Sequence, residues 1–293
     1  LLALLDASPV NFLAAQYVEQ QLAAAGFVHL DAADPFPPMK PGDQYYVTKN
    51  GTAVFAFRVG SQAPQEAGFK LICAHSDSPG FRIKPKAEMA CEGGVVKLNT
   101  EVYGGPILYT WFDRPLSVAG RVLLRGADPL HPVSRRICIR RPLLVIPHLA
   151  IHFNRQVNDG VKLSKQKDML PLLGIVQDTL ERGNMLVNVI CEELHIQEKD
   201  ILDFDLYLCD ATPACTFGVH NEFISSGRLD DLSMVHAGLE ALLQADSQPE
   251  TTQVLAIFDN EETGSQTKQG AGSPFLCQVL QRLAFAAGGT MDD

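Results

Sequence analysis

The sequence predicts an α/β protein in which a β-rich segment interrupts one α/β domain. Near both ends of the chain, segments with helical periodicity alternate with short apolar runs that are typical of buried strands. The middle of the chain carries short strand-like runs separated by glycines and prolines. With 46% hydrophobic residues among 293, the chain can bury a sizeable core. We therefore expect one domain from residues 1–80 and 221–293, with a β-rich domain of residues 81–220 inserted in it.

The N-terminal part is expected to form a helix followed by a hairpin. Apolar residues recur at helical spacing over residues 8–26, and Gly26 is a typical helix end. Residues 45–48 and 52–59 are strand-like and flank Asn50-Gly51, a dipeptide typical of tight hairpin turns. The other elements expected in this domain are strands over residues 69–74 and 254–258, and helices over residues 229–245 and 274–287.

The inserted segment is expected to be mainly strands, with helical character towards its end. Its expected strands cover residues 95–98, 116–124, 143–146 and 201–209. Helical spacing is expected over residues 168–182 and 185–194.

Composition excludes several classes of partner. The net charge of −10 argues against a nucleic-acid-binding groove, and no apolar run approaches the roughly 20 residues of a membrane span. The first five residues lack a basic flank and a cleavage pattern, so we do not expect a signal peptide there. The seven cysteines include no CxxC pair, which argues against a cysteine zinc site and for a reducing, cytoplasmic setting.

Two adjacent carboxylates, Glu261 and Glu262, directly follow the apolar run at 254–258. Ligand-binding and catalytic groups collect at strand ends in α/β sheets. Adjacent carboxylates repel unless a cation is close, and a divalent metal supplies one. One glutamate can then bind the metal while its neighbour accepts a proton from water. The alternative is a solvated acidic loop, which is the commoner explanation for such a pair taken alone.

His75-Ser76-Asp77 also ends an apolar strand. In an extended H-x-D motif the two outer side chains point the same way. Asp77 could therefore orient His75 as a metal ligand and raise its basicity. The alternative is an ordinary polar turn before Pro79-Gly80.

Asp230 and Asp231 open the helix expected over residues 229–245. Aspartate at a helix start commonly caps free N–H groups and complements the helix dipole. One of the two could instead bridge two metals. Asp230 is our choice as ligand and Asp231 as cap or supporting residue, but their spacing leaves this open.

His148 and His152 form an H-x3-H pair after Pro147. On a helix both would share one face, and Pro147 permits a helix start there. No glutamate follows His148 in the zincin manner, and such histidines are more often ordinary buried or surface groups than ligands. His220 is equally ambiguous. A nucleophile elbow, a P-loop and a dinucleotide fingerprint are absent from the sequence.

Taken in order, these segments resemble the aspartyl aminopeptidase family of zinc metallopeptidases, and bacterial members in particular. The matching stretches are CAHSDSPGFRIKP (73–85), EVYGGPILYTWFDRPLSVAGRV (101–122), IPHLAIHFNR (146–155), NEFISSGRLDDL (221–232) and FDNEETGSQTKQGA (258–271). Each motif alone is weak, but five in order over nearly the whole chain are specific.

The resemblance implies a zinc-peptidase-like catalytic domain, with a central mixed sheet flanked by helices, and an inserted domain that makes dimers. It implies two Zn²⁺ ions per subunit, for which Co²⁺ or Mn²⁺ could substitute. His75 would bind one zinc, Asp230 would bridge both, and Glu262 would bind the other. Glu261 would be the general base, and Asp77 would hold His75.

The activity implied is release of N-terminal residues, preferably Asp or Glu, from peptides by zinc-activated water. The dimers would build a tetrahedral assembly of twelve, and His152 would reach into a neighbour's active site to help bind substrate. The family's two other metal ligands, an Asp and a His, match no position in this sequence, so we expect them beyond Asp293 or not at all.

Two other functions remain open. One is a related two-zinc hydrolase with another substrate, such as a broad aminopeptidase or a deacylase, which a basic residue in the specificity pocket would argue against. The other is a degenerate peptidase kept as a non-catalytic scaffold. The set of His75, Asp77, Asp230, Glu261 and Glu262 favours an enzyme, because a scaffold would not need it.

Overall fold

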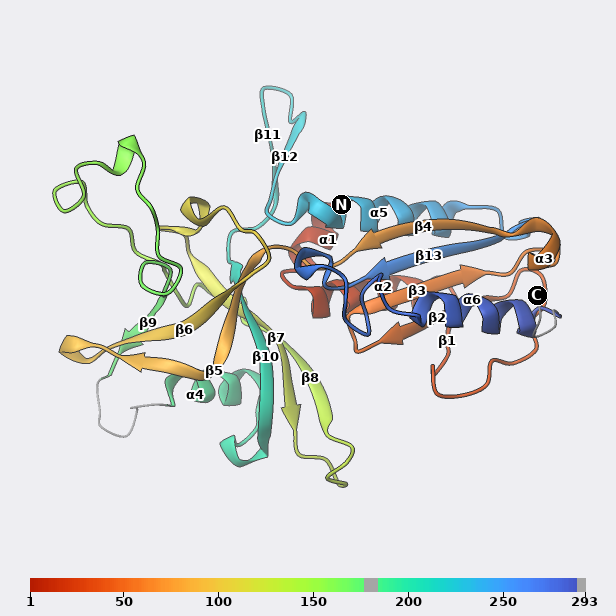
Figure 1. Cartoon of the computed structure of the whole chain (residues 1–293), viewed down its shortest axis with the longest axis horizontal. Helices are drawn as coiled ribbons and strands as arrows, with labels where there is room; N and C mark the ends of the chain where they lie inside the picture. Colours follow the sequence, from red (N-terminus) through yellow and green to blue (C-terminus); the bar gives the residue numbers. More distant parts are fainter. Residues whose placement is uncertain (177–183, 289–293) are drawn as a thin grey trace. The chain divides into compact units, whose positions relative to one another are not determined.

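The computed structural model describes residues 1–176 and 184–288, and the chain divides into two units. Unit 1 comprises Leu1–Ser78 and Ala214–Asp293, and unit 2 comprises Pro79–Pro213. Sheets and helices occur in both (Figure 1), so the predicted α/β class is confirmed. None of the helices in the described residues combines the length and the apolar character that crossing a bilayer requires.

Unit 1 is built on a five-stranded mixed sheet. Its strands follow the order β1-β2-β3-β13-β4, and β13 pairs antiparallel with β3 and parallel with β4. The strands are β1 (Val28–His29), β2 (Gln44–Lys49), β3 (Ala53–Arg58), β4 (Phe69–His75) and β13 (Thr252–Phe258). A separate two-stranded sheet is formed by β11 (Cys215–Phe217) and β12 (Phe223–Ser225).

The turn between β2 and β3 is the hairpin that the sequence predicts. Asn50 has a φ of 57° and Gly51 a φ of 72°. Positive φ at both central residues defines the type I′ turn, whose twist matches the flanking antiparallel strands.

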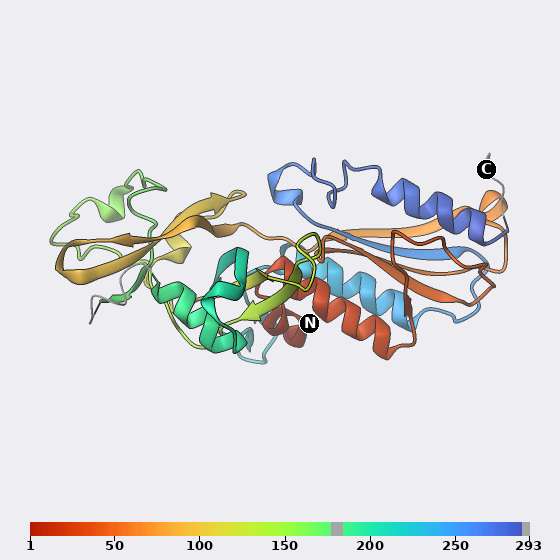
Figure 2. The same ribbon diagram turned by 90° about the horizontal axis from the view of Figure 1, so that it is seen from below.

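Helices cover both faces of this sheet (Figure 2). Residues of β13 alternate between two cores: Leu255 and Ile257 pack with residues of α2 and α5, while Val254 and Ala256 pack with residues of α6. A strand covered on both faces has a continuous apolar run, which is why 254–258 lacks polar alternation. The helices of unit 1 are α1 (Leu2–Ala7), α2 (Asn11–Ala24), α3 (Pro64–Ala67), α5 (Leu229–Gln244) and α6 (Phe275–Ala286).

Unit 2 is dominated by a six-stranded sheet with the order β8-β7-β10-β5-β6-β9. One hydrophobic core lies within it and includes Phe81, Leu116, Ile146 and Leu206, together with Ile190 of helix α4. The elements are β5 (Gly80–Ala90), β6 (Val95–Tyr103), β7 (Leu116–Leu124), β8 (Val133–Cys138), β9 (Leu172–Ile175), β10 (Ile201–Asp210) and α4 (Met185–Leu194).

Two local predictions for unit 2 are wrong. The helix expected over residues 168–182 is replaced at 172–175 by strand β9, which pairs with β6; residues 177–182 lie outside the described residues. A short apolar run is compatible with either a helix or a strand, and here pairing with β6 stabilises the strand. The strand expected over residues 143–146 makes only isolated bridges. Residues 147–153 form a loop and a turn, so the condition under which His148 and His152 would share a helix face is not met.

Candidate metal centre

Three segments of unit 1 meet where strands β4 and β13 end. The parallel strands β4 and β13 end side by side, because Phe258 is the register partner of His75 and its carbonyl accepts the Ser76 N–H at 2.9 Å. The short helix η6 (Glu261–Thr263) follows β13 at this edge. The start of α5 contributes the third segment, because Asp231 binds the main chain of His75.

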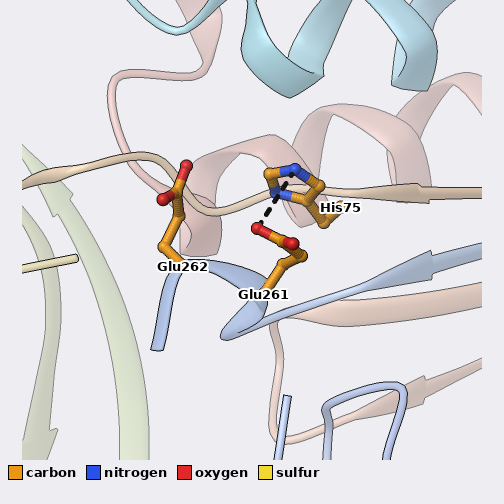
Figure 3. A group of neighbouring side chains, drawn as sticks. All are labelled: His75, Glu261 and Glu262. Carbon is orange, nitrogen blue, oxygen red and sulfur yellow. Dashed lines mark ion pairs between the residues drawn. The ribbon is translucent and has the colours of Figure 1, made fainter. Parts of the chain in front are cut away.

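The imidazole of His75 lies among carboxylates. Its Nε2 atom is 3.4 Å from Asp230 Oδ1, 3.8 Å from Glu261 Oε2 and 4.0 Å from Asp231 Oδ2. Ligand atoms of His75, Glu261 and Glu262 lie within 4.8 Å of one another (Figure 3), and so do those of His75, Asp230 and Asp231. An imidazole with several carboxylates is a donor set that suits zinc, so the residues present fit such an ion.

Asp77 connects the histidine to the glutamate segment. Its side chain is buried, and Oδ1 lies 3.3 Å from Nδ1 of His75. The same carboxylate accepts the main-chain N–H of Glu261 on Oδ1 and that of Glu262 on Oδ2, both at 3.2 Å. One buried carboxylate therefore orients residues from both strand ends. The sequence predicts only its link to His75, because the other contacts join positions far apart in the chain.

The two aspartates at the start of α5 have different surroundings. Asp231 Oδ2 accepts the main-chain N–H of His75 at 3.1 Å, and the Asp231 side chain is 16% exposed. The Asp230 side chain is 86% exposed, with its carboxylate turned towards His75 Nε2. The N-cap position of α5 is Arg228, which makes no side-chain cap hydrogen bond, and Asp231 bonds the main chain of His75 instead of a helix N–H group. The peptide bond between them is cis.

The charges of the cluster shift two pKa values. Burial lowers the pKa of His75, but the hydrogen bond and charge of Asp77, with the charges of Asp231 and Glu261, outweigh it and raise the pKa to about 9. Burial and the nearby charge of Asp77 raise the pKa of Glu262 above its usual value, against the opposing effect of His75. Both shifts show excess negative charge, which a bound cation would relieve.

Asn260 fixes the loop that carries the two glutamates. Its Oδ1 accepts hydrogen bonds from Thr267 Oγ1 at 2.8 Å and Gln269 Nε2 at 2.9 Å. Its backbone φ is 61°, a conformation that asparagine tolerates better than most residues. The preceding Asp259 is buried and accepts a hydrogen bond from Asn11 Nδ2 at 2.9 Å, which ties the loop to the first turn of α2. Neither residue is among the sequence-predicted site residues; their place beside two acidic residues is the only signal.

The remaining histidine candidates lie outside this cluster. His152 belongs to unit 2, where it is exposed in the turn at 151–153. His148 lies in the same loop, and the centre of its ring is 4.6 Å from that of the Phe112 ring. His220 lies in the β11–β12 turn, where its main-chain N–H donates to the Glu222 carboxylate.

Comparison with known proteins gives one consistent family. The model of the aminopeptidase I zinc metalloprotease (M18) family matches residues 4–293. A probable M18 family aminopeptidase 2 of Clostridium acetobutylicum is 50% identical over 286 residues, which are 98% of this chain and 66% of that protein. The chain therefore spans just under two thirds of the length of that relative.

Solved structures show the same fold. The structure of an Ape4 and Nbr1 complex aligns with a TM-score of 0.93 and 33% identity, covering 99% of this chain and 59% of that one. The S. cerevisiae mApe1 dodecamer aligns with a TM-score of 0.83 and 22% identity, covering 97% of this chain and 65% of that one. At that lower identity the likeness shows the fold alone.

Proposed function

Because the chain belongs to the M18 family of aminopeptidase I zinc metalloproteases, we propose that its protein is a zinc aminopeptidase that releases N-terminal residues from peptides. The observation that carries this proposal is the convergence of His75, Asp230, Glu261 and Glu262 at one sheet edge, held by buried Asp77. As the chain spans about two thirds of its relative, the proposal concerns the whole protein.

We assign different roles to the five residues. His75 and Glu262 would each bind one of two zinc ions, and Asp230 would bridge them. Bound zinc would polarise the scissile carbonyl and lower the pKa of the attacking water. Glu261, whose side chain is 56% exposed, would take the proton of that water and pass it to the leaving amine.

Asp77 would act as a positioning residue. The main-chain carbonyl of Asp77 lies 3.1 Å from His75 Nδ1, and its carboxylate lies 3.3 Å away. A proton held on Nδ1 by these acceptors leaves the lone pair of Nε2 for a metal. Asp231 would support the same ring through its bond to the His75 main chain.

We further propose a preference for peptides that begin with Asp or Glu, and self-association through the domain of residues 81–220 into dimers and an assembly of twelve. Both the preference and the assembly rest on the family resemblance; the S. cerevisiae mApe1 structure, which shares the fold, is itself a dodecamer. His152 would contribute to substrate binding in a neighbouring subunit.

The seven free cysteines support a reducing, cytoplasmic setting.

Two substitutions test the assigned roles against each other. Glu261→Gln should retain bound zinc but lose at least about 100-fold in kcat, the scale of general base catalysis. Glu262→Gln should lose bound zinc. Zinc content is measured by atomic emission and kcat with an aminoacyl reporter amide. Full activity in Glu261→Gln, or unchanged zinc content in Glu262→Gln, would contradict the assignments.

A further inference from the structure

The turn that joins α1 to α2 is buried, whereas most connections between helices run over the surface. Ser8, Pro9 and Val10 form this α1–α2 turn, and all three are buried. A buried main-chain carbonyl needs a hydrogen-bond donor, because leaving it without one costs free energy. The α1–α2 turn therefore depends on donors from the elements that pack around it.

Arg228 supplies two donors to this region. Its Nε atom donates to the Ser8 carbonyl at 3.1 Å, and its Nη2 atom donates to the Leu5 carbonyl, in the last turn of α1, at 3.2 Å. The main chain of the same residue starts α5, since its carbonyl accepts the Leu232 N–H at 3.3 Å. The start of α5 is thereby fixed to the α1–α2 turn two residues before Asp230, the proposed bridging ligand.

The residue that follows the α1–α2 turn is tied to the glutamate loop. Asn11, the first residue of α2, is 6% exposed, and its Nδ2 atom donates to Asp259 Oδ1 at 2.9 Å. The same oxygen accepts the main-chain N–H of Asn260 at 2.8 Å, directly before Glu261 and Glu262. Both acidic segments of the candidate metal centre are therefore hydrogen-bonded to the region of one buried turn.

The position of Asp230 depends on how its main chain is held. Its side chain is 86% exposed, so packing does not fix the carboxylate. The Ser78 hydroxyl donates to the Asp230 carbonyl at 3.1 Å, and Arg228 holds the chain two residues earlier. Metal–ligand distances tolerate deviations of only about 0.2 Å, so a small shift of this main chain would weaken metal binding.

We propose that Arg228 and Asn11 are positioning residues through which the α1–α2 turn sets the spacing between Asp230 and Glu262. The proposal rests on the metal-binding roles assigned to those two carboxylates above. It adds the N-terminal helices, which lie outside the ligand cluster, to the parts of the chain that determine metal affinity.

The test measures metal binding by Arg228→Gln and by Asn11→Ala in the complete protein. Each variant should bind Zn²⁺ about tenfold more weakly, the lower end of the effect expected of groups that orient metal ligands. Loaded with Co²⁺, each should also show a changed visible absorption spectrum. That spectrum reports the geometry of the metal ligands, which a merely structural residue would leave unchanged.

Arg58→Gln is the matched control for Arg228→Gln. Arg58 is 4% exposed, and its Nη1 atom donates to the carbonyls of Ala245 at 3.2 Å and Asp246 at 3.1 Å, at the opposite end of α5. The control should lower the urea midpoint of the metal-free protein but leave the zinc affinity and the cobalt spectrum of wild type.

Ser117→Ala is the matched control for Asn11→Ala. Ser117 is 1% exposed, and its Oγ atom donates to the Ile139 carbonyl at 2.8 Å within unit 2. If Arg228→Gln does not fold, Arg228→Lys takes its place: lysine keeps the charge but lacks the planar fork of the guanidinium, so zinc affinity should still fall, by a smaller factor. Circular dichroism checks the fold of each variant.

Weaker zinc binding by both variants, with both controls like wild type, supports the proposal. A folded variant with the zinc affinity and cobalt spectrum of wild type, or an equal loss of affinity in a control, would overturn it. These measurements need no turnover. An inactive wild type whose metal binding depends on Arg228 and Asn11 would refute the proposed peptidase function and leave the positioning role standing. An active wild type whose variants bind zinc equally well would do the reverse.

Discussion

Substituting Asp77 by asparagine tests the idea that one buried carboxylate organises the metal centre. In the native protein its two oxygens accept two main-chain N–H groups, from Glu261 and Glu262, and one of them also faces His75. Asparagine keeps one acceptor and turns an NH₂ group towards the other donor. It also removes the charge that helps raise the pKa of His75.

The magnitude follows from these contacts. A hydrogen bond to a charged group contributes about 1.5–3 kcal/mol, and an unsatisfied buried donor costs about 1–3 kcal/mol. Asp77→Asn should therefore lower the free energy of unfolding by about 2–4 kcal/mol. Because groups that orient metal ligands typically change metal affinity 10- to 100-fold, zinc affinity should fall by about that factor.

The assay combines urea unfolding of the metal-free protein with zinc titration against a competing chromogenic chelator. Asp43→Asn is the control, because the Asp43 carboxylate also accepts a main-chain N–H, that of Lys40, in an exposed turn away from the cluster. The control should change stability by about 1 kcal/mol or less and leave zinc affinity unchanged. An Asp77→Asn protein with wild-type zinc affinity would refute the organising role.

Three further predictions concern the protonation of His75, the loop held by Asn260, and the proposed role of His152. The pKa of His75 is raised to about 9 from 6.5, so its ion pairs stabilise the metal-free protein fully below about pH 6.5, and this contribution is lost as the pH rises through about 9. The urea midpoint of wild type should exceed that of His75→Gln by more at about pH 6 than at about pH 10, and an equal gap at both would contradict this. Asn260→Ala removes the acceptor that fixes the glutamate loop and should lower kcat or zinc affinity about tenfold, whereas the exposed Lys268→Ala on the same loop should change neither. His152→Phe should lower kcat without changing zinc content, and a fully active variant would remove His152 from the substrate site.

Strand β13 shows why part of the fold can be predicted from sequence. Its apolar run is continuous because both faces are buried. The acidic pair from which the sequence predicts a metal site follows its C-terminal end. The Asn50-Gly51 turn is similarly local, since two positive φ values leave few residue choices. Strand β9 is the opposite case: Leu172 and Leu173 fit either a helix or a strand, and pairing with β6, which no local pattern shows, decides.

The same distinction holds for the candidate site, where local sequence predicts some of the residues but not the contacts between them. His75 and the two glutamates can be proposed from their positions after apolar strands. The contact of Asp77 with the glutamate main chain, and that of Asp231 with the His75 main chain, cannot be. Both contacts join residues more than 150 positions apart, and they exist because β4, β13 and α5 pack together. The role of Asn260 cannot be predicted from the sequence either, because it depends on hydrogen bonds from Thr267 and Gln269 that form only in the folded loop.

The most direct test of the central claim measures metal content and hydrolysis on one preparation of the complete protein, with and without added zinc. The substrates are an aspartyl reporter amide and its leucyl analogue. The account predicts two bound zinc ions per subunit and faster cleavage of the aspartyl substrate. Bound zinc with faster cleavage of the leucyl amide, or with cleavage of neither, would contradict the proposed substrate preference and leave a zinc hydrolase of another specificity. A protein that binds no zinc and cleaves neither substrate, even when zinc is supplied, would contradict the account as a whole.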